Sequence, residues 1–129
     1  GRMGLNALNR NDKYNVSAVY YKREHIMTDG TAMCGTHIKV KIEDKRNKSV
    51  SQPIQNLMTD STTMLVSTRN LQEYDKYDEL YLMGKRWQIV ELQTAYENTE
   101  INGLTNPQLL AVHYLALNEL GGEPLWIRP

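Results

Sequence analysis

The residue types that can do chemistry on their own are few and scattered in this chain. The single cysteine, Cys34, is followed by His37 and preceded by His25, a set that includes three potential metal ligands. Structural zinc sites normally use four ligands in paired spacings, and no second Cys/His pair follows here. A nucleophilic thiol would require a histidine base in an electropositive setting, and no active-site signature surrounds Cys34. We therefore expect a small buried or loop thiol, no metal ion and no cofactor.

An acidic cluster and a lone histidine are the other candidates for chemistry. Asp75, Asp78 and Glu79 stand around Lys76 at the start of a β-prone stretch. They could form a carboxylate pair or a cation site, but surface clusters of this kind are usually a solvated edge, which is our expectation. His113 lies in an apolar run, where a satisfied core or interface histidine is the default. Phosphate-binding and nucleophile-elbow motifs are absent from the sequence, so we expect no catalytic residues and no enzyme.

A basic stretch offers the remaining chemistry, which is binding. Residues 44–56 (DKRNKSVSQPIQN) are polar, contain Pro53 and carry Lys45, Arg46 and Lys48. We expect a long exposed loop here. With stacking faces on Tyr20, Tyr21 and Trp87, such a loop would suit a single-strand nucleic-acid-binding barrel of the OB type. The neutral total charge favours an ordinary solvated loop instead.

Length, composition and charge restrict the class of protein. The chain has 129 residues, 40% of them hydrophobic, with 15 basic and 15 acidic side chains. These values predict one compact domain with a real core. A single cysteine indicates a reducing compartment. The apolar runs are far shorter than the roughly 20 residues that cross a bilayer, so we expect no membrane association.

The neutral total hides a division of charge along the chain. Residues 1–50 hold ten basic and five acidic side chains, and residues 51–129 hold five basic and ten acidic ones. The halves therefore carry +5 and −5. If the fold places them on different faces, neighbouring copies could meet with opposite sign, which would set register and steering.

Alternating patterns predict an antiparallel β protein. In Tyr14–Arg23 the residues at 14, 16, 18 and 20 share one face, and in His37–Glu43 apolar residues alternate with charged ones. The first pattern, rich in β-branched and aromatic residues, predicts a strand, and the second is typical of a strand with one wet face. Residues 62–68 are β-prone as well, and Asp29-Gly30 favours a tight turn. Residues 71–75 are either a helical turn or a connection.

The clearest local signal is a hairpin over residues 78–92 (DELYLMGKRWQIVEL), whose second strand can continue to Tyr96. Leu80 and Leu82 alternate before a tight turn that we place at Gly84-Lys85. Residues 107–120 remain ambiguous, because Asn106, Pro107 and Gly121 frame a helix whereas the apolar residues also alternate as in a strand. Short β-segments at regular spacing predict one small antiparallel β domain over residues 14–120, a barrel or a sandwich.

The two ends of the chain look less able to form a core. Residues 1–13 are rich in Asn, Arg and Gly, with isolated apolar side chains at Met3, Leu5 and Leu8, and we expect a flexible N-terminal arm. Residues 121–129 form a C-terminal extension whose Trp126 would be costly to leave in water. We expect these four apolar residues to dock on a partner.

The block 78–92 contains, in order, an acid, an apolar residue, a Gly-Lys turn, an aromatic residue and an Ile/Val pair. In this order of residue types it resembles the head-closure or head–tail adaptor proteins of tailed bacteriophages. A looser match covers residues 14–117 through the early strand, Asp29-Gly30, the long polar loop and a late apolar strand at Val112-His113-Tyr114. The extension from Leu120 to Pro129 is not part of the pattern.

The resemblance implies a small β-barrel, with a strand at 109–117, that forms a homo-oligomeric ring at the head–tail connection. The ring would close the DNA-filled head, with a portal or adaptor ring above and tail proteins below. It would be assembled in the host cytoplasm and end in the virion. The long loop, through Lys45, Arg46, Lys48, Gln52 and Gln55, would face the central channel near packaged DNA or a neighbouring subunit. The nucleic-acid-binding barrel and a small enzyme using Cys34 are the alternative hypotheses.

Overall fold

The structure is a computed structural model that describes residues 13–32, 34–47, 49–96 and 111–121, and the backbone of residues 126–127. Six strands form its centre. They are β1 (Val16–Tyr21), β3 (Thr36–Glu43), β4 (Thr63–Thr68), β5 (Glu79–Leu82), β6 (Lys85–Tyr96) and β7 (Ala111–Leu120). The smaller elements are the 3-10 turn η1 (Arg23–His25), β2 (Thr31–Ala32), the helix α2 (Gln52–Leu57) and β8 (Trp126–Ile127).

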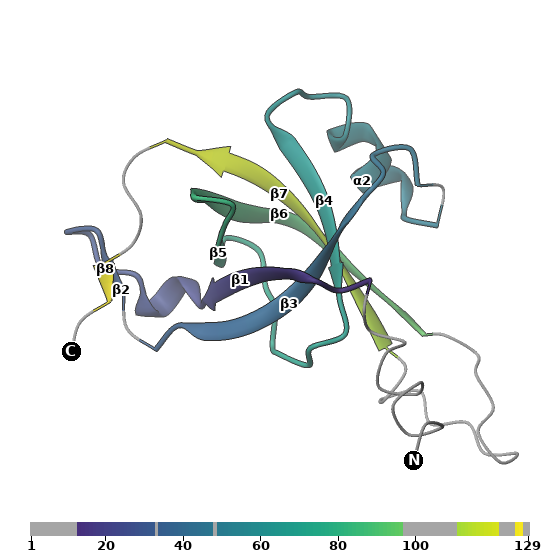
Figure 1. Cartoon of the computed structure of the whole chain (residues 1–129). Helices are drawn as coiled ribbons and strands as arrows, with labels where there is room; N and C mark the ends of the chain where they lie inside the picture. Colours follow the sequence, from purple (N-terminus) through teal and green to yellow (C-terminus); the bar gives the residue numbers. More distant parts are fainter. Residues whose placement is uncertain (1–12, 33, 48, 97–110, 122–125, 128–129) are drawn as a thin grey trace, which may run out of the picture.

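The six strands close into an antiparallel barrel in the order β1-β3-β4-β7-β6-β5 (Figure 1). The chain builds two meanders of three strands each, β1-β3-β4 and β5-β6-β7, and the barrel closes where β4 pairs with β7 and β1 pairs with β5. The predicted fold class, a mainly β protein with a small antiparallel barrel, is confirmed. The ambiguous stretch forms a strand over Ala111–Leu120, so the helix alternative is wrong for those residues.

Period-two alternation explains the barrel interior. Ala18 and Tyr20 of β1 point inward, as do Ile38 and Val40 of β3, which confirms the expected inward faces. Alternate residues of the other strands complete one apolar cluster, namely Val66, Leu80, Leu82, Trp87, Ile89, Leu115 and Leu117. Burying these side chains is the main driving force for closing the barrel.

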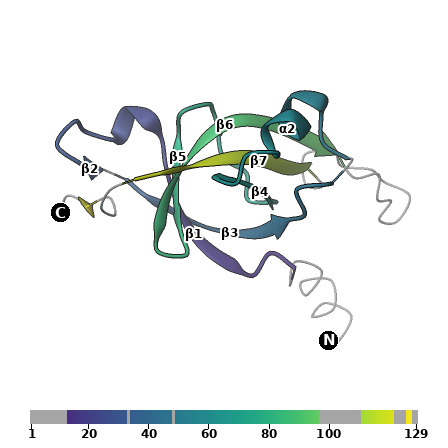
Figure 2. The ribbon, with the colours of Figure 1, turned by 90° about the horizontal axis from the view of Figure 1, so that it is seen from above.

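The helix α2 adds a second layer on the outside of the barrel, and it corrects the prediction of a long exposed loop. Ser51 precedes a helix whose first turn contains Pro53, a residue preorganised for that position. Ile54 is fully buried and packs with Val50 and Met58 against Leu65 and Ala116 of β4 and β7. Figures 1 and 2 both show α2 on the outer face of the barrel. Because α2 covers β7 from outside, β7 is apolar on both faces, and this explains its helix-like sequence pattern.

The predicted hairpin is present, with its turn one residue earlier than expected. Leu82 pairs with Lys85, so Met83 and Gly84 are the turn residues, with φ of 51° and 76°. Positive φ at both positions is the type I′ geometry whose twist matches that of the flanking strands. The second strand continues to Tyr96, as predicted, with a bulge between Ile89 and Glu91. Residues 71–75 are a connection without helix.

A small sheet lies beside the barrel. β2 pairs in parallel with β8, and its Ala32 forms an antiparallel bridge with Ile26. The backbone of the C-terminal extension is therefore hydrogen-bonded to the strand that follows the turn at Asp29-Gly30. In Figures 1 and 2, this sheet and η1 lie on the side of the barrel away from α2. The barrel closes without any contribution from β8.

Candidate functional site: a cleft beside β3

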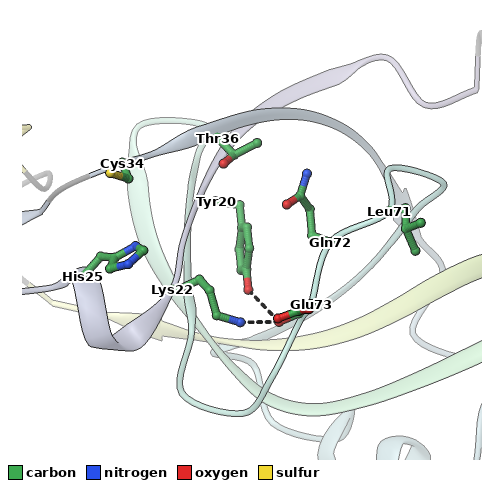
Figure 3. A pocket seen from close by; sticks show the side chains of 8 residues that line it. All are labelled: Tyr20, Lys22, His25, Cys34, Thr36, Leu71, Gln72 and Glu73. Carbon is green, nitrogen blue, oxygen red and sulfur yellow. Dashed lines mark hydrogen bonds between the residues drawn. The ribbon is translucent and has the colours of Figure 1, made fainter.

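A cleft of about 700 Å³ opens between the beginning of β3 and the connection that follows β4 (Figure 3). This volume is in the range of ligand-binding pockets in proteins. Its lining residues come from β1, η1, β3 and the connection, and they are Tyr20, Lys22, His25, Cys34, Thr36, Leu71, Gln72 and Glu73.

The cleft exists because β4 leaves β3 early. The two strands pair only over Lys41–Glu43 and Leu65–Ser67. The Thr68 hydroxyl then donates to the Lys39 carbonyl at 2.7 Å, and after Thr68 the chain turns away across the end of the barrel. The first half of β3 therefore has β1 on one side and the cleft on the other. Backbone groups of alternate residues point to the same edge of a strand. His37 thus presents its N–H and C=O at the edge of β3 opposite β1, the same edge at which the Lys39 carbonyl accepts from Thr68.

Tyr20 forms the floor of the cleft and anchors the connection. Its hydroxyl donates to Asp78 Oδ2 at 2.5 Å and lies 3.1 Å from the carbonyl oxygen of Glu73. Lys22 Nζ also donates to the Glu73 carbonyl, at 2.5 Å, as Figure 3 shows. Burial, and then the neighbouring Asp78 carboxylate, raise the pKa of Tyr20 well above its ordinary value. Tyr20 is thus a neutral hydrogen-bond donor at physiological pH.

Asp78 corrects the prediction of a solvated acidic edge. It is only 2% exposed, and its carboxylate accepts hydrogen bonds from the backbone N–H groups of Arg23 (2.8 Å) and Asp75 (2.9 Å) as well as from Tyr20. Lys22 Nζ lies 4.0 Å from Oδ2. The carboxylate therefore joins β1, η1 and the connection, and its role is structural.

Glu79 is buried as well, and the same correction applies to it. Its carboxylate receives two hydrogen bonds from Arg86, from Nε and Nη2, both at 2.9 Å. A bidentate pair of this kind satisfies both groups and fixes β5 against β6. Asp75 alone of the predicted acidic cluster is exposed. The three carboxylates do not converge on a common point in the way that a cation site requires.

Cys34 stands on an exposed loop, with φ of 59°. His25, from η1, lines the same cleft, and its Nδ1 is buried without a hydrogen-bond partner. Figure 3 shows both side chains on the same side of the cleft. Within the part of the chain that the structure describes, no group of three or more Cys, His, Asp or Glu side chains is arranged to hold a metal ion.

His113 is buried, as predicted, but is only partly satisfied. Its Nδ1 lies 3.1 Å from the Thr94 hydroxyl, and its ring packs 5.2 Å from that of Tyr74 between centroids. Its Nε2 is buried without a hydrogen-bond partner. Burial lowers the pKa of His113, because the charged form would lose its hydration.

The residues predicted to face a channel lie outside the cleft, around α2. Arg46 and Gln52 are exposed, whereas Lys45 donates to the carbonyl of Asp60 at 3.1 Å. Gln55 donates to the Asn47 carbonyl and so holds the segment together. Lys48 lies outside the described residues. Arg46 and Gln52 are therefore the best-placed members of this set for contact with another molecule.

The structure tests the predicted stacking residues but not the side chains of the predicted docking residues. Met3, Leu5 and Leu8 lie outside the described residues, and only the backbone of Trp126 is described, in β8. The three aromatic residues proposed as stacking faces for nucleic acid are all at most 6% exposed, so that part of the alternative is wrong; they are Tyr20, Tyr21 and Trp87.

Several large apolar side chains are exposed that sequence reasoning did not single out. Leu71 is 70% exposed at the rim of the cleft, and Tyr96 is 60% exposed at the end of β6. Met83 is 56% exposed at the hairpin tip. Leu71 stands alone among polar neighbours in the sequence, and this isolation is the signal that could have identified it.

Comparisons with protein-family models, with curated proteins and with solved structures find no match. Among the described residues, no helix has the length and apolar character needed to span a membrane. The site is thus a cleft beside an unpaired stretch of β3, with a neutral tyrosine at its floor and an exposed leucine at its rim.

Proposed function

We propose that this chain is a virion structural protein of a tailed bacteriophage that forms a ring at the head–tail connection. The ring closes the DNA-filled head and docks the tail. A portal or adaptor ring lies above it and tail proteins lie below. It assembles in the host cytoplasm and remains in the virion.

The observation that carries the proposal is the hairpin β5–β6 in its barrel. The sequence of residues 78–92 resembles that of head-closure and adaptor proteins, and in the structure it forms a hairpin inside a small closed barrel. The resemblance implies this architecture.

The exposed apolar residues support the same proposal. Leu71 and Tyr96 are each more than half exposed, although the barrel core has formed without them. A subunit that completes the burial of its apolar surface on assembly gains stability from its neighbours. Arg46 and Gln52, beside α2, then provide polar side chains for a channel wall or a subunit contact.

Antibody labelling of phage particles tests the proposal. An antibody raised against the purified chain, applied to particles of the phage that encodes it, should label one position, the junction of head and tail, in electron micrographs. Particles that lack the protein should keep filled heads only transiently and should carry no tails. Labelling elsewhere on the particle, or none after the junction is exposed by tail removal, would contradict the proposal.

A further inference from the structure

Two strands of the barrel each have an edge that is unpaired over part of its length among the described residues. The first is the edge of β3 beside the cleft, where His37 presents its backbone groups on the side opposite β1. The second belongs to β6, which pairs with β5 only over Lys85–Gln88. From Gln93 to Tyr96, β6 has β7 on one side and no described strand on the other. Unpaired edges are templates for pairing with another chain.

Each open edge has an exposed apolar side chain beside it. Leu71, on the cleft rim opposite β3, and Tyr96, at the end of β6, are the two most exposed large hydrophobic residues of the described chain, at 70% and 60%. Strand addition to a sheet edge typically combines a backbone ladder with side chains that fill neighbouring pockets. A cleft of about 700 Å³ beside the β3 edge provides such a pocket.

The two edges lie on different sides of the barrel. In Figures 1 and 2 the end of β6 points away from η1, which flanks the cleft. One molecule therefore cannot bring its own two edges together, whereas two copies can join them head to tail. A contact between two different patches is heterologous, and repetition of it produces a closed ring when the rotation between copies is suitable.

We infer that the cleft beside β3 receives the β6 edge of a second copy of this chain, with Tyr96 of one copy seated near Leu71 of the next. The arrangement follows from the two unpaired edges, which lie on different sides of the barrel, and from their exposed apolar side chains, Leu71 and Tyr96. The inference rests on the proposed ring and specifies the contact that would build it.

Aspartate substitutions at the two apolar residues test the contact. Leu71→Asp and Tyr96→Asp each place a charge at one side of the interface, and Met83→Asp is the control, since Met83 is similarly exposed at the hairpin tip. Far-UV circular dichroism and thermal melting establish that each variant is folded. In sedimentation velocity, the first two variants should be monomers at concentrations where the unaltered chain and Met83→Asp form the oligomer.

Mixing the two variants tests the head-to-tail geometry. Leu71→Asp keeps an intact β6 edge, and Tyr96→Asp keeps an intact cleft, so an equimolar mixture should form dimers and nothing larger. A mixture that stays monomeric would show that the intact cleft of Tyr96→Asp does not bind the intact β6 edge of Leu71→Asp. That result overturns the inference. Unchanged assembly of either variant, or an unaltered chain that remains monomeric, overturns it as well.

The native cysteine supplies a second measurement. Cys34 lies in the cleft, so Tyr96→Cys should cross-link successive copies under mild oxidation and give a ladder of multimers on non-reducing gels. Met83→Cys should not, and Cys34→Ser should remove the ladder. A ladder no stronger than that of Met83→Cys would argue against the contact. If the contact fails while particles are still labelled at the head–tail junction, the proposed function stands and this interface does not.

Discussion

At the scale of single residues, Asp78 is the position on which most local structure depends. Its carboxylate accepts from the Tyr20 hydroxyl and from two backbone N–H groups, those of Arg23 and Asp75. These donors come from β1, from η1 and from the connection, so one carboxylate closes the end of the barrel and shapes the floor of the cleft.

Asp78→Asn should lower the free energy of unfolding by about 2 to 3 kcal/mol, because hydrogen bonds to a charged acceptor are replaced and a buried donor is left without a partner. Urea unfolding followed by circular dichroism measures this change. Asp75→Asn is the matched control and should change stability by less than about 0.5 kcal/mol, as expected for an exposed carboxylate. Equal effects at the two positions would show that Asp78 is not the anchor.

His113 gives the protein a pH dependence. Burial lowers its pKa in the folded state below the ordinary value of 6.5, so the unfolded chain binds a proton more readily. The contribution of neutral His113 to the free energy of unfolding is complete above pH 6.5. It is lost as the pH falls from 6.5 toward the lowered pKa of the folded state. His113→Gln should therefore flatten the decrease in the free energy of unfolding between pH 7.5 and pH 5. An unchanged slope in the variant would assign the dependence to other groups.

At the scale of elements, strands with one wet face were predictable and elements with two covered faces were not. In β3 the inward residues alternate with polar ones, so the sequence pattern alone identified its faces, whereas Tyr21 on the outward face of β1 is buried with Ala32 of β2. In β7, α2 covers the outer face, and the resulting apolar run looked equally like a helix. α2 itself has six residues, and only its docking through Ile54 explains why it forms.

The structural role of Asp78 could not be predicted from neighbouring residues, because its partners are distant in the sequence. Its partners Tyr20 and Arg23 are 58 and 55 positions away in the sequence. Only closure of the barrel brings β1 beside β5, so a charged residue near Lys76 looked like an ordinary surface group. The cleft depends in the same way on where β4 leaves β3, and the sequence of Thr68 to Leu71 does not reveal that point.

The hairpin turn offers a test at this scale. Both turn residues have positive φ, a conformation that methionine adopts with strain and that asparagine tolerates well. Met83→Asn should therefore raise the free energy of unfolding by about 0.5 to 1 kcal/mol, and Gly84→Ala should lower it by about 1 kcal/mol. Urea midpoints of the two variants measure these opposite changes. A change of the same sign in both would rule out a type I′ turn.

At the scale of the whole molecule, the division of charge acquires a spatial meaning. β1 and β3 come from the basic half of the sequence and are neighbours in the barrel, while β4, β7, β6 and β5 come from the acidic half. The strands of the two halves therefore occupy different arcs of one closed sheet, whereas Lys45 donates to the Asp60 carbonyl and α2, which follows Arg46, packs against β4 and β7. Complementary charge between neighbouring copies would favour correct encounters more than it raises affinity.

Charge reversal tests that complementarity. Arg46→Glu, at an exposed position before α2, should weaken assembly in about 0.1 M salt, and the loss should disappear in about 1 M salt, where the screening length is only about 3 Å. Lys85→Glu changes the net charge equally at the hairpin, where it also breaks the exposed Lys85–Glu119 ion pair, and should have a smaller effect on assembly. Sedimentation velocity at both salt concentrations compares them. A loss that does not depend on salt would indicate a contact other than charge.

Native mass spectrometry of the purified chain, alone and with the portal protein of the same phage, tests the central claim most directly. The ring predicts one closed species with a fixed number of subunits, formed by the chain itself or on the portal, and a circular outline of that species in electron micrographs. A chain that remains a monomer at every concentration and does not associate with the portal would contradict the proposal that it is a ring-forming protein of the head–tail connection.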